Sequence, residues 1–272
     1  MKQRSIWPLL AAASLLASLT LIAGFGLVVK EMWLPSSTAS GETVKSPPST
    51  TKATPLEEAN EIRIVALGDS LTKGTGDSSG KGYVTRLAEG LNKRADKPAK
   101  VLNNLAVGGM RASELSERLA KDNGYRMAVE EANLIVFTIG GNDLFMSARA
   151  KMGKRELKAV SVEELTVDMD VALDRFRGVV RLLHELNPAA TIVYMGLYNP
   201  FYDIEGLRDI SLKIQVWNKE AYETLHAYPN MLMVPTFDLF EGKIGDYLSS
   251  DHFHPGDVGY ERIASRMLES LK

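Results

Sequence analysis

The chain has 272 residues, of which 24% are charged and 45% hydrophobic, and its formal net charge is −2 at pH 7. This composition is typical of a globular protein, and the near-neutral total charge gives no indication of a nucleic-acid partner. The chain contains no cysteine, so a disulfide framework, a thiol nucleophile and any cysteine-ligated zinc or iron–sulfur site are excluded.

The N-terminal segment has the features of a membrane anchor. Lys2 and Arg4 precede an uncharged run over residues 5–29, which exceeds the roughly 7–15 apolar residues of a secretory signal and suffices for the ~20 of a spanning helix. Because basic residues precede the run, we expect the N-terminus inside and the rest of the chain outside. We therefore favour an uncleaved, single-pass signal-anchor in residues 1–34, with the remainder on the extracellular face of the cell membrane. The alternative is a cleaved signal peptide and a secreted protein.

The segment that follows differs from the rest of the chain in composition. Residues 35–60 are rich in Ser, Thr, Pro and Lys and contain no aromatic residue. Such a segment has too little apolar surface to form a core, which predicts a flexible linker. We place the folded domain at residues 61–272.

From residue 62 onward, short apolar runs alternate with segments of helical periodicity. The runs predict strands at 62–67, 101–105, 134–139, 191–197 and 231–234, and the periodic segments predict helices at 83–93, 162–186, 208–226 and 260–271. This alternation indicates an α/β fold, with a parallel sheet covered by helices on both faces. In such sheets the functional residues lie beyond the carboxyl ends of the strands.

Four polar or glycine-rich motifs occur at the expected positions. They are Gly68-Asp69-Ser70-Leu71 after the first strand, Asn104 to Gly109 at the end of the second, Gly140-Gly141-Asn142-Asp143 after the third, and Asp251 to Pro255 before the last helix. Each motif alone is also compatible with a turn or a helix cap. Their combination at one edge of the sheet favours a catalytic site.

The residue types in these motifs suit nucleophilic catalysis. A serine hydroxyl needs a base to remove its proton, and His254 can be that base for Ser70. Asp251, three residues earlier, can accept a hydrogen bond from the other imidazole nitrogen and fix its tautomer. The backbone N–H groups of Ser70 and Gly109 and the side-chain amide of Asn142 are candidate donors for an oxyanion hole.

The sequence resembles the GDSL, or SGNH, family of esterases and lipases, which is named for four sequence blocks. The four blocks occur here as Ser70, Gly109, Asn142 and His254, with Asp251 completing the last. The resemblance covers roughly residues 62–271. It implies a three-layer α/β/α sandwich with a flavodoxin-like, five-stranded parallel sheet, and hydrolysis through a serine acyl-enzyme without metal or other cofactor. In the second block, Gly108 remains an alternative to Gly109.

Two other kinds of site are disfavoured by the sequence. The Gly-x-Ser-x-Gly elbow of α/β-hydrolases is absent because Thr72 stands two residues after Ser70. A metal site is not expected, because only His252 and His254 are close in sequence and His254 already has a role as the base.

The substrate is less well defined than the reaction. Tyr198, Phe201 and Tyr202 follow the fourth strand, where aromatic side chains are suited to line a substrate pocket, although an ordinary aromatic loop is equally compatible. We expect a small-molecule, lipid or glycan ester as substrate, cleaved by an esterase of lipase or lysophospholipase type. A carbohydrate or cell-wall O-acetyl esterase is a second hypothesis. A non-catalytic glycan- or lipid-binding module is a third, from a different class.

Overall fold

The computed structural model describes residue 18 and residues 55–94, 97–145, 169–205 and 207–271. The chain forms two compact units, Met1–Thr50 and Thr51–Lys272. In the first unit only Ser18 is described, as an exposed helical residue. Across the described residues, no helix combines the length and the apolar character needed to span a membrane. The predicted anchor at residues 1–34 lies outside the described residues except for Ser18, so it stays a prediction.

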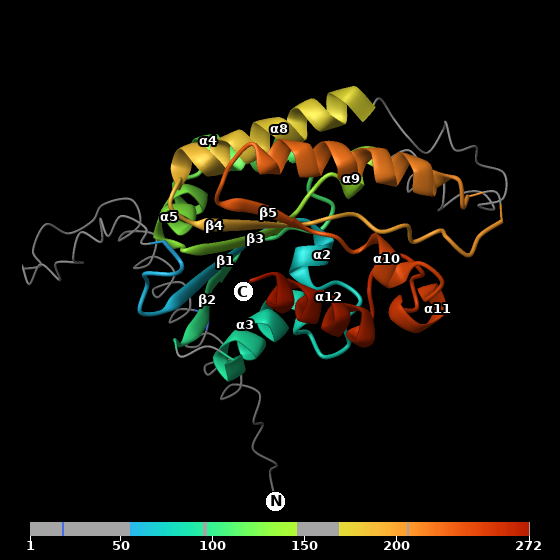
Figure 1. Cartoon of the computed structure of the whole chain (residues 1–272), viewed down its shortest axis with the longest axis horizontal. Helices are drawn as coiled ribbons and strands as arrows, with labels where there is room; N and C mark the ends of the chain where they lie inside the picture. Colours follow the sequence, from blue (N-terminus) through green and yellow to red (C-terminus); the bar gives the residue numbers. More distant parts are fainter. Residues whose placement is uncertain (1–17, 19–54, 95–96, 146–168, 206, 272) are drawn as a thin grey trace, which may run out of the picture. The chain divides into compact units, whose positions relative to one another are not determined.

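The second unit is built on a five-stranded sheet in which every pairing is parallel (Figure 1). Its order is β2-β1-β3-β4-β5, the flavodoxin-like order. The strands are β1 (Ile62–Gly68), β2 (Ala99–Asn104), β3 (Leu134–Thr138), β4 (Thr191–Met195) and β5 (Met231–Val234). The predicted fold class is therefore confirmed, and each predicted strand is present to within two residues.

Helices cover both faces of this sheet and complete a three-layer α/β/α sandwich (Figure 1). One face carries α4 (Ala112–Lys121), α5 (Asn123–Glu131), α8 (Met169–Leu186) and α9 (Ile210–His226), and the other carries α3 (Gly82–Arg94) and α12 (Asp257–Ser270). Three short helices complete the described elements: α2 (Ser70–Lys73), α10 (Phe237–Phe240) and α11 (Ile244–Tyr247).

The alternation of side chains along the strands divides the core into two clusters. In β1, Val65 and Leu67 face the α8 side, while Ile64 and Ala66 face the α12 side, as the two-residue period of a strand requires. Because both faces are covered, β3 is buried over its whole length, which explains its continuous apolar sequence.

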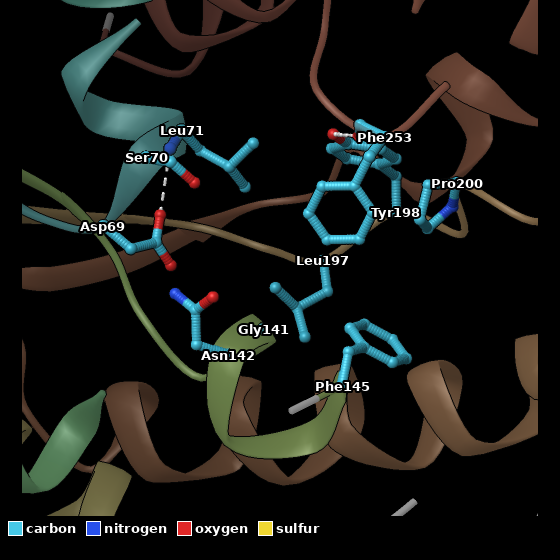
Figure 2. Close-up of a pocket in the computed structure, with 10 residues that line it drawn as sticks. All are labelled: Asp69, Ser70, Leu71, Gly141, Asn142, Phe145, Leu197, Tyr198, Pro200 and Phe253. Atoms are coloured by element: carbon cyan, nitrogen blue, oxygen red, sulfur yellow. Dashed lines mark hydrogen bonds between the residues drawn. The ribbon is translucent and has the colours of Figure 1, made fainter. Parts of the chain in front are cut away.

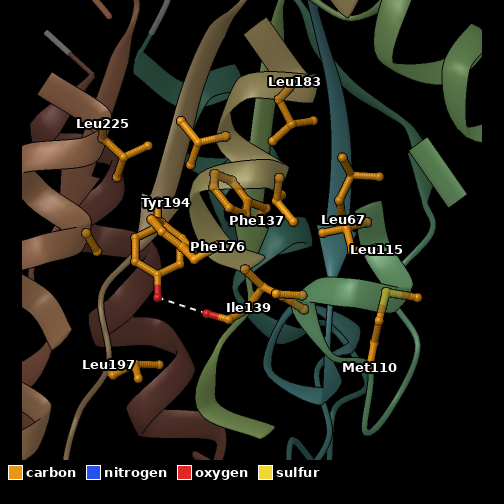
Figure 3. Close-up of a cluster of buried hydrophobic side chains, with 14 of the residues drawn as sticks. Leu67, Met110, Leu115, Phe137, Ile139, Phe176, Leu183, Tyr194, Leu197 and Leu225 are labelled. Atoms are coloured by element: carbon orange, nitrogen blue, oxygen red, sulfur yellow. Dashed lines mark hydrogen bonds between the residues drawn. The ribbon is translucent and has the colours of Figure 1, made fainter. Parts of the chain in front are cut away.

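The larger cluster, on the α8 side, includes Ile139, the first residue after β3. Figure 3 shows Phe137, Phe176 and Tyr194 at its centre, where Tyr194 donates a hydrogen bond to the carbonyl of Ile139 at 2.9 Å. Trp217 donates in turn to the Tyr194 hydroxyl at 3.0 Å. This arrangement holds the end of β3 in place, immediately before the glycine-rich motif.

The predicted helices differ from the structure mainly in number. Those at 83–93, 208–226 and 260–271 are present as α3, α9 and α12, and the described part of 162–186 is α8. Helices α4 and α5 were not among the predicted elements. The apolar spacing in α4 is that of a short amphipathic helix, with Leu115 and Leu119 one turn apart and both buried.

Residues 55–60, the last six of the predicted linker, pack against the domain. Ala59 is buried, and Leu56 packs against the cluster on the α12 side. Lys97 donates to the carbonyl of Leu56 at 3.1 Å. Residues 55–60 therefore belong to the folded domain, and the rest of the predicted linker, residues 35–54, lies outside the described residues.

Candidate active site

Ser70 lies at the carboxyl edge of the sheet, on the turn between β1 and α2. Asp69 caps α2, with its carboxylate accepting the N–H of Leu71 at 3.0 Å. Gly68 has φ +115°, and a Cβ at this position would lie 1.8 Å from the carbonyl oxygen of Thr138, so only glycine allows β1 and β3 to approach this closely. As the first residue of α2, Ser70 has an N–H with no acceptor inside the helix.

His254 connects Ser70 to Asp251 in one row of hydrogen bonds. Its Nε2 lies 2.8 Å from Ser70 Oγ, and its Nδ1 lies 2.5 Å from Asp251 Oδ2. A carboxylate can only accept a hydrogen bond, so Nδ1 carries the proton and Nε2 is left to accept from the serine hydroxyl. The row has the order and the protonation that a nucleophile, a base and an orienting acid require.

Several hydrogen bonds within the loop hold the Asp251 carboxylate in place. Asp251 Oδ1 accepts from the N–H groups of Phe253 and His254 and from the hydroxyl of Ser249, at 3.0, 2.9 and 2.8 Å. Burial alone would raise the pKa of the Asp251 carboxyl. The bonds from His254 and from these donors prevail and hold that pKa well below its usual range.

The loop is also anchored to the end of β4. Tyr198 donates to the carbonyl of Phe253 at 2.7 Å, and its ring stacks on Phe240 with centroids 4.0 Å apart. The position of His254 is therefore determined by contacts on both sides of the loop, and its side chain is almost fully buried.

Asn142 and Asp143 join the loop after β3 to the loop after β2. The Asn142 amide donates to the carbonyl of Met110 at 2.9 Å, and Asp143 Oδ2 accepts the N–H of Ala112 at 3.0 Å. Burial raises the pKa of the Asp143 carboxyl, against this bond and the charge of Arg175. The two side chains thus set the position of the Gly109 turn relative to Ser70.

Gly109 occupies a turn from Val107 to Met110. The Met110 N–H donates to the Val107 carbonyl at 3.1 Å, and Gly109 has φ +83°, as the third residue of a type II turn requires. Gly108 and Gly109 are both exposed and line a surface hollow together with Glu114, Glu117 and Arg118. Glycine is conformationally required at 109, and the oxyanion role of this residue stays a prediction.

A pocket opens beside Ser70 and is lined mainly by apolar side chains (Figure 2). Its empty volume is about 370 Å³, including solvent at its mouth. The lining residues come from four segments: Asp69, Ser70 and Leu71; Gly141, Asn142 and Phe145; Leu197, Tyr198 and Pro200; and Phe253.

The three aromatic residues predicted to line the pocket have different positions. Tyr198 lines it directly. Phe201 lies behind it, with its ring centroid 5.9 Å from that of Phe145 and 6.0 Å from that of Phe253. Tyr202 is not among the lining residues and packs against the cluster on the α12 side.

Four apolar lining residues were not predicted: Leu71, Phe145, Leu197 and Phe253. Leu71 and Phe253 lie within two of the predicted motifs, Leu197 is the last residue of the predicted strand 191–197, and Phe145 follows Asp143 by two residues, and this proximity is the signal that the sequence offers. As for metals, within the described ranges no group of three or more His, Asp or Glu side chains is placed to hold an ion.

Comparison with known proteins identifies the family. The GDSL-like Lipase/Acylhydrolase family model matches residues 66–262. The uncharacterized protein YpmR of Bacillus subtilis is 34% identical over 226 residues, which cover 81% of this chain and 86% of YpmR. The spore germination lipase LipC of Bacillus licheniformis is 27% identical over 76% of this chain and 94% of LipC.

Solved structures share the fold at lower sequence identity. The lipase Lip_vut3 from a goat rumen metagenome has a TM-score of 0.65 and 24% identity, covering 77% of this chain and 97% of that one. A variant of the acetyl xylan esterase Axe2 of Geobacillus stearothermophilus has a TM-score of 0.55 and 19% identity, covering 77% and 94%.

The fold and these relatives define the protein as an ester-hydrolysing enzyme built on a three-layer α/β/α sandwich. It belongs to the GDSL-like lipase/acylhydrolase family.

Proposed function

We propose that the protein is a serine carboxyl-ester hydrolase that works through a Ser70–His254–Asp251 triad and an acyl-enzyme. The observation that carries this proposal is the continuous row from Ser70 Oγ to His254 to Asp251, with distances of 2.8 and 2.5 Å. The row begins at the wall of a pocket that is lined mainly by apolar side chains.

In the acylation step, Ser70 Oγ forms a bond to the ester carbonyl carbon while its proton passes to His254 Nε2. Asp251 stabilises the imidazolium that results. The carbonyl oxygen becomes an oxyanion, for which the N–H groups of Ser70 and Gly109 and the amide of Asn142 are the proposed donors. The bond to the alcohol oxygen then breaks, and the alcohol leaves with the proton from His254.

In the deacylation step, water takes the place of the alcohol. His254 removes a proton from the water as its oxygen attacks the acyl carbon. The bond to Ser70 Oγ breaks, and the serine regains its proton from His254. The products are a carboxylic acid and the free enzyme.

The pocket supports an acyl chain of a few carbons as the group held beside Ser70. Leu71, Leu197 and Phe253 present aliphatic and aromatic surface, and the described lining includes a single charged group, Asp69. An O-acetyl ester on a carbohydrate is the alternative substrate. We rank it second because an acetyl group would leave most of this apolar wall without contact.

A panel of p-nitrophenyl esters from acetate to palmitate tests both the reaction and the substrate class. We expect turnover that rises from acetate to a short or medium chain and then falls, and we expect Ser70→Ala and His254→Ala to remove nearly all activity while remaining folded. The matched control is His252→Asn, because His252 is exposed and has φ 51°, a conformation that asparagine tolerates. Acetate as the best substrate favours the carbohydrate esterase. Folded wild-type protein without turnover on any ester favours a binding module.

We further propose that the domain is tethered to the outer face of the cell membrane through residues 1–34. The support is the uncharged run at 5–29 with basic residues before it. Intact-mass analysis of the membrane fraction is expected to give the uncleaved chain. A mature protein that starts after residue 24 contradicts the anchor.

A further inference from the structure

Asp69 has no part in the proposed proton transfers, yet it is adjacent to the nucleophile and lines the same pocket. Its side chain is 2% exposed and contributes to the pocket wall. Burial raises the pKa of its carboxyl, against hydrogen bonds from Thr138 and from the N–H of Leu71 and against the charge of His254. A carboxylate this buried requires specific donors around it.

A chain of three buried hydroxyl groups extends from Asp69 into the domain. Thr138, at the end of β3, donates to Asp69 Oδ1 at 2.7 Å. Thr72 Oγ1 lies 2.8 Å from Thr138 Oγ1, and Tyr83 Oη lies 2.6 Å from Thr72 Oγ1. All four side chains are almost fully buried, so water cannot substitute for a missing partner.

These hydrogen bonds have a single consistent direction when Asp69 is ionised. A hydroxyl has one hydrogen to donate, and that of Thr138 goes to the carboxylate. Thr138 therefore accepts from the hydroxyl of Thr72, and also from its N–H at 3.2 Å. The hydrogen of Thr72 is then in use, so the Tyr83 hydroxyl must donate to Thr72. Every step directs a donor toward Asp69.

The chain connects three elements to the turn that carries Ser70. Thr138 belongs to β3, Thr72 to α2 and Tyr83 to α3. Asp69 also accepts the N–H of Leu71 through the same Oδ1, as Figure 2 shows. Because Ser70 lies between Asp69 and Leu71, this bond sets the direction of its N–H and of its Oγ.

We propose that Asp69 is a positioning residue for Ser70, and that the buried relay Tyr83–Thr72–Thr138 holds its carboxylate in place. The inference rests on the proposed function, because it assumes that Ser70 is the nucleophile. Its consequence is that a hydroxyl on a neighbouring strand, with no contact to the substrate, controls the rate of attack by Ser70.

Thr138→Val and Thr138→Ser provide the test. Valine retains the shape of threonine but removes both the donor to Asp69 and the acceptor of the Thr72 hydroxyl and N–H, whereas serine retains both and removes only a methyl group. We expect kcat of the valine variant to fall about 10- to 100-fold, as a small misplacement of a reacting group typically causes, with KM changed less than about threefold. The rate of labelling by a fluorophosphonate is expected to fall in parallel. The serine variant is expected to recover most of kcat, even where its thermal stability is lower than that of the valine variant.

Tyr83→Phe and Tyr260→Phe form a matched pair for a milder change. Both tyrosines are fully buried, but the hydroxyl of Tyr260 donates to the carbonyl of Thr75 at 2.8 Å, outside the relay. We expect Tyr83→Phe to lower kcat and the labelling rate about 2- to 5-fold, and Tyr260→Phe to lower thermal stability only. If Thr138→Val does not fold, this pair and Thr138→Ser decide the question.

Two outcomes contradict the proposal: wild-type kcat and labelling rate in a folded Thr138→Val or Tyr83→Phe variant, or equal losses of kcat in the valine and serine variants at position 138. These results differ from a failure of the proposed function. If the proposed function is wrong, the wild-type enzyme is not inactivated by the label, or Ser70→Ala retains activity.

Discussion

At the scale of single residues, the site combines two carboxylates that have different environments. The Asp251 side chain is 45% exposed, and the hydrogen bonds that it accepts hold its pKa below the usual range, so it is ionised at neutral pH. Asp69 is fully buried, and burial raises its pKa. The first carboxylate faces the imidazole of His254, and the second faces the turn that carries Ser70. Under the proposals made above, Asp251 orients the base and Asp69 positions the nucleophile.

The lowered pKa of Asp251 predicts a pH-dependent contribution to stability. Since the folded-state pKa is below the unfolded value of about 3.9, the stabilisation is present above pH ~4 and is lost as the pH falls through the folded-state pKa. We expect Asp251→Asn to lower the Tm at pH 7, with a smaller gap from the wild type at pH 3. The exposed Asp203 supplies the control: Asp203→Asn makes the same charge change and is expected to leave the Tm nearly unchanged at both pH values. A gap for Asp251→Asn that is equal at pH 3 and pH 7 contradicts this account.

The same substitution tests the role of Asp251 in catalysis. An asparagine offers an amide in place of an acceptor-only group and favours the wrong imidazole tautomer. In serine proteases the equivalent change lowers kcat by about 10⁴-fold, and we expect a large loss here, measured with the best p-nitrophenyl ester. Activity within about threefold of the wild type would exclude Asp251 from the triad.

At the scale of elements, the site depends on how closely the ends of β1 and β3 approach their neighbours. Gly68 meets the backbone of Thr138, and Gly140 meets the indole of Trp217, where an added Cβ would lie 2.1 Å from Cζ2. Trp217 and Tyr194 hold the end of β3 from the α9 side. Gly140, two residues before Asn142, is therefore required by the packing against Trp217.

Gly140→Ala is expected to destabilise the domain by about 2–3 kcal/mol. The added methyl group overlaps the Trp217 ring, and the residue has φ +103°, which alanine adopts only with strain. Denaturant unfolding measures the effect, and Gly245→Ala is the control because a Cβ there meets nothing within 4 Å. Equal stability of the two variants contradicts the close approach of Gly140 to Trp217.

At the scale of the whole molecule, the sequence was sufficient to predict the sheet and the four motifs at its carboxyl edge. Apolar runs such as 134–139 are distinctive because β3 is buried on both faces. Helix α4 is short and mostly polar, so its two core leucines produced a weak signal. The relay to Asp69 was not predictable, because Thr72, Tyr83 and Thr138 belong to three elements and no spacing in the sequence relates them.

For the pocket too, the sequence motifs predict some of the residues, whereas other contacts depend on residues far apart in the chain. Ser70 and Asn142 were identified from their motifs, whereas the contacts of Phe145 and Phe253 with the ring of Phe201 depend on tertiary packing. Composition predicted a single globular domain, and the motifs predicted its reaction. The shape of the pocket beside Ser70 depends on contacts between residues that are far apart in the sequence.

The most direct measurement of the central claim is the site of covalent labelling by a fluorophosphonate, mapped by mass spectrometry on the full chain. We expect one label, on Ser70, that is absent from Ser70→Ala and greatly slowed in His254→Ala. The His252→Asn variant is expected to react at the wild-type rate. A label on another serine, or undiminished labelling of the Ser70→Ala protein, would contradict the assignment of Ser70 as the nucleophile.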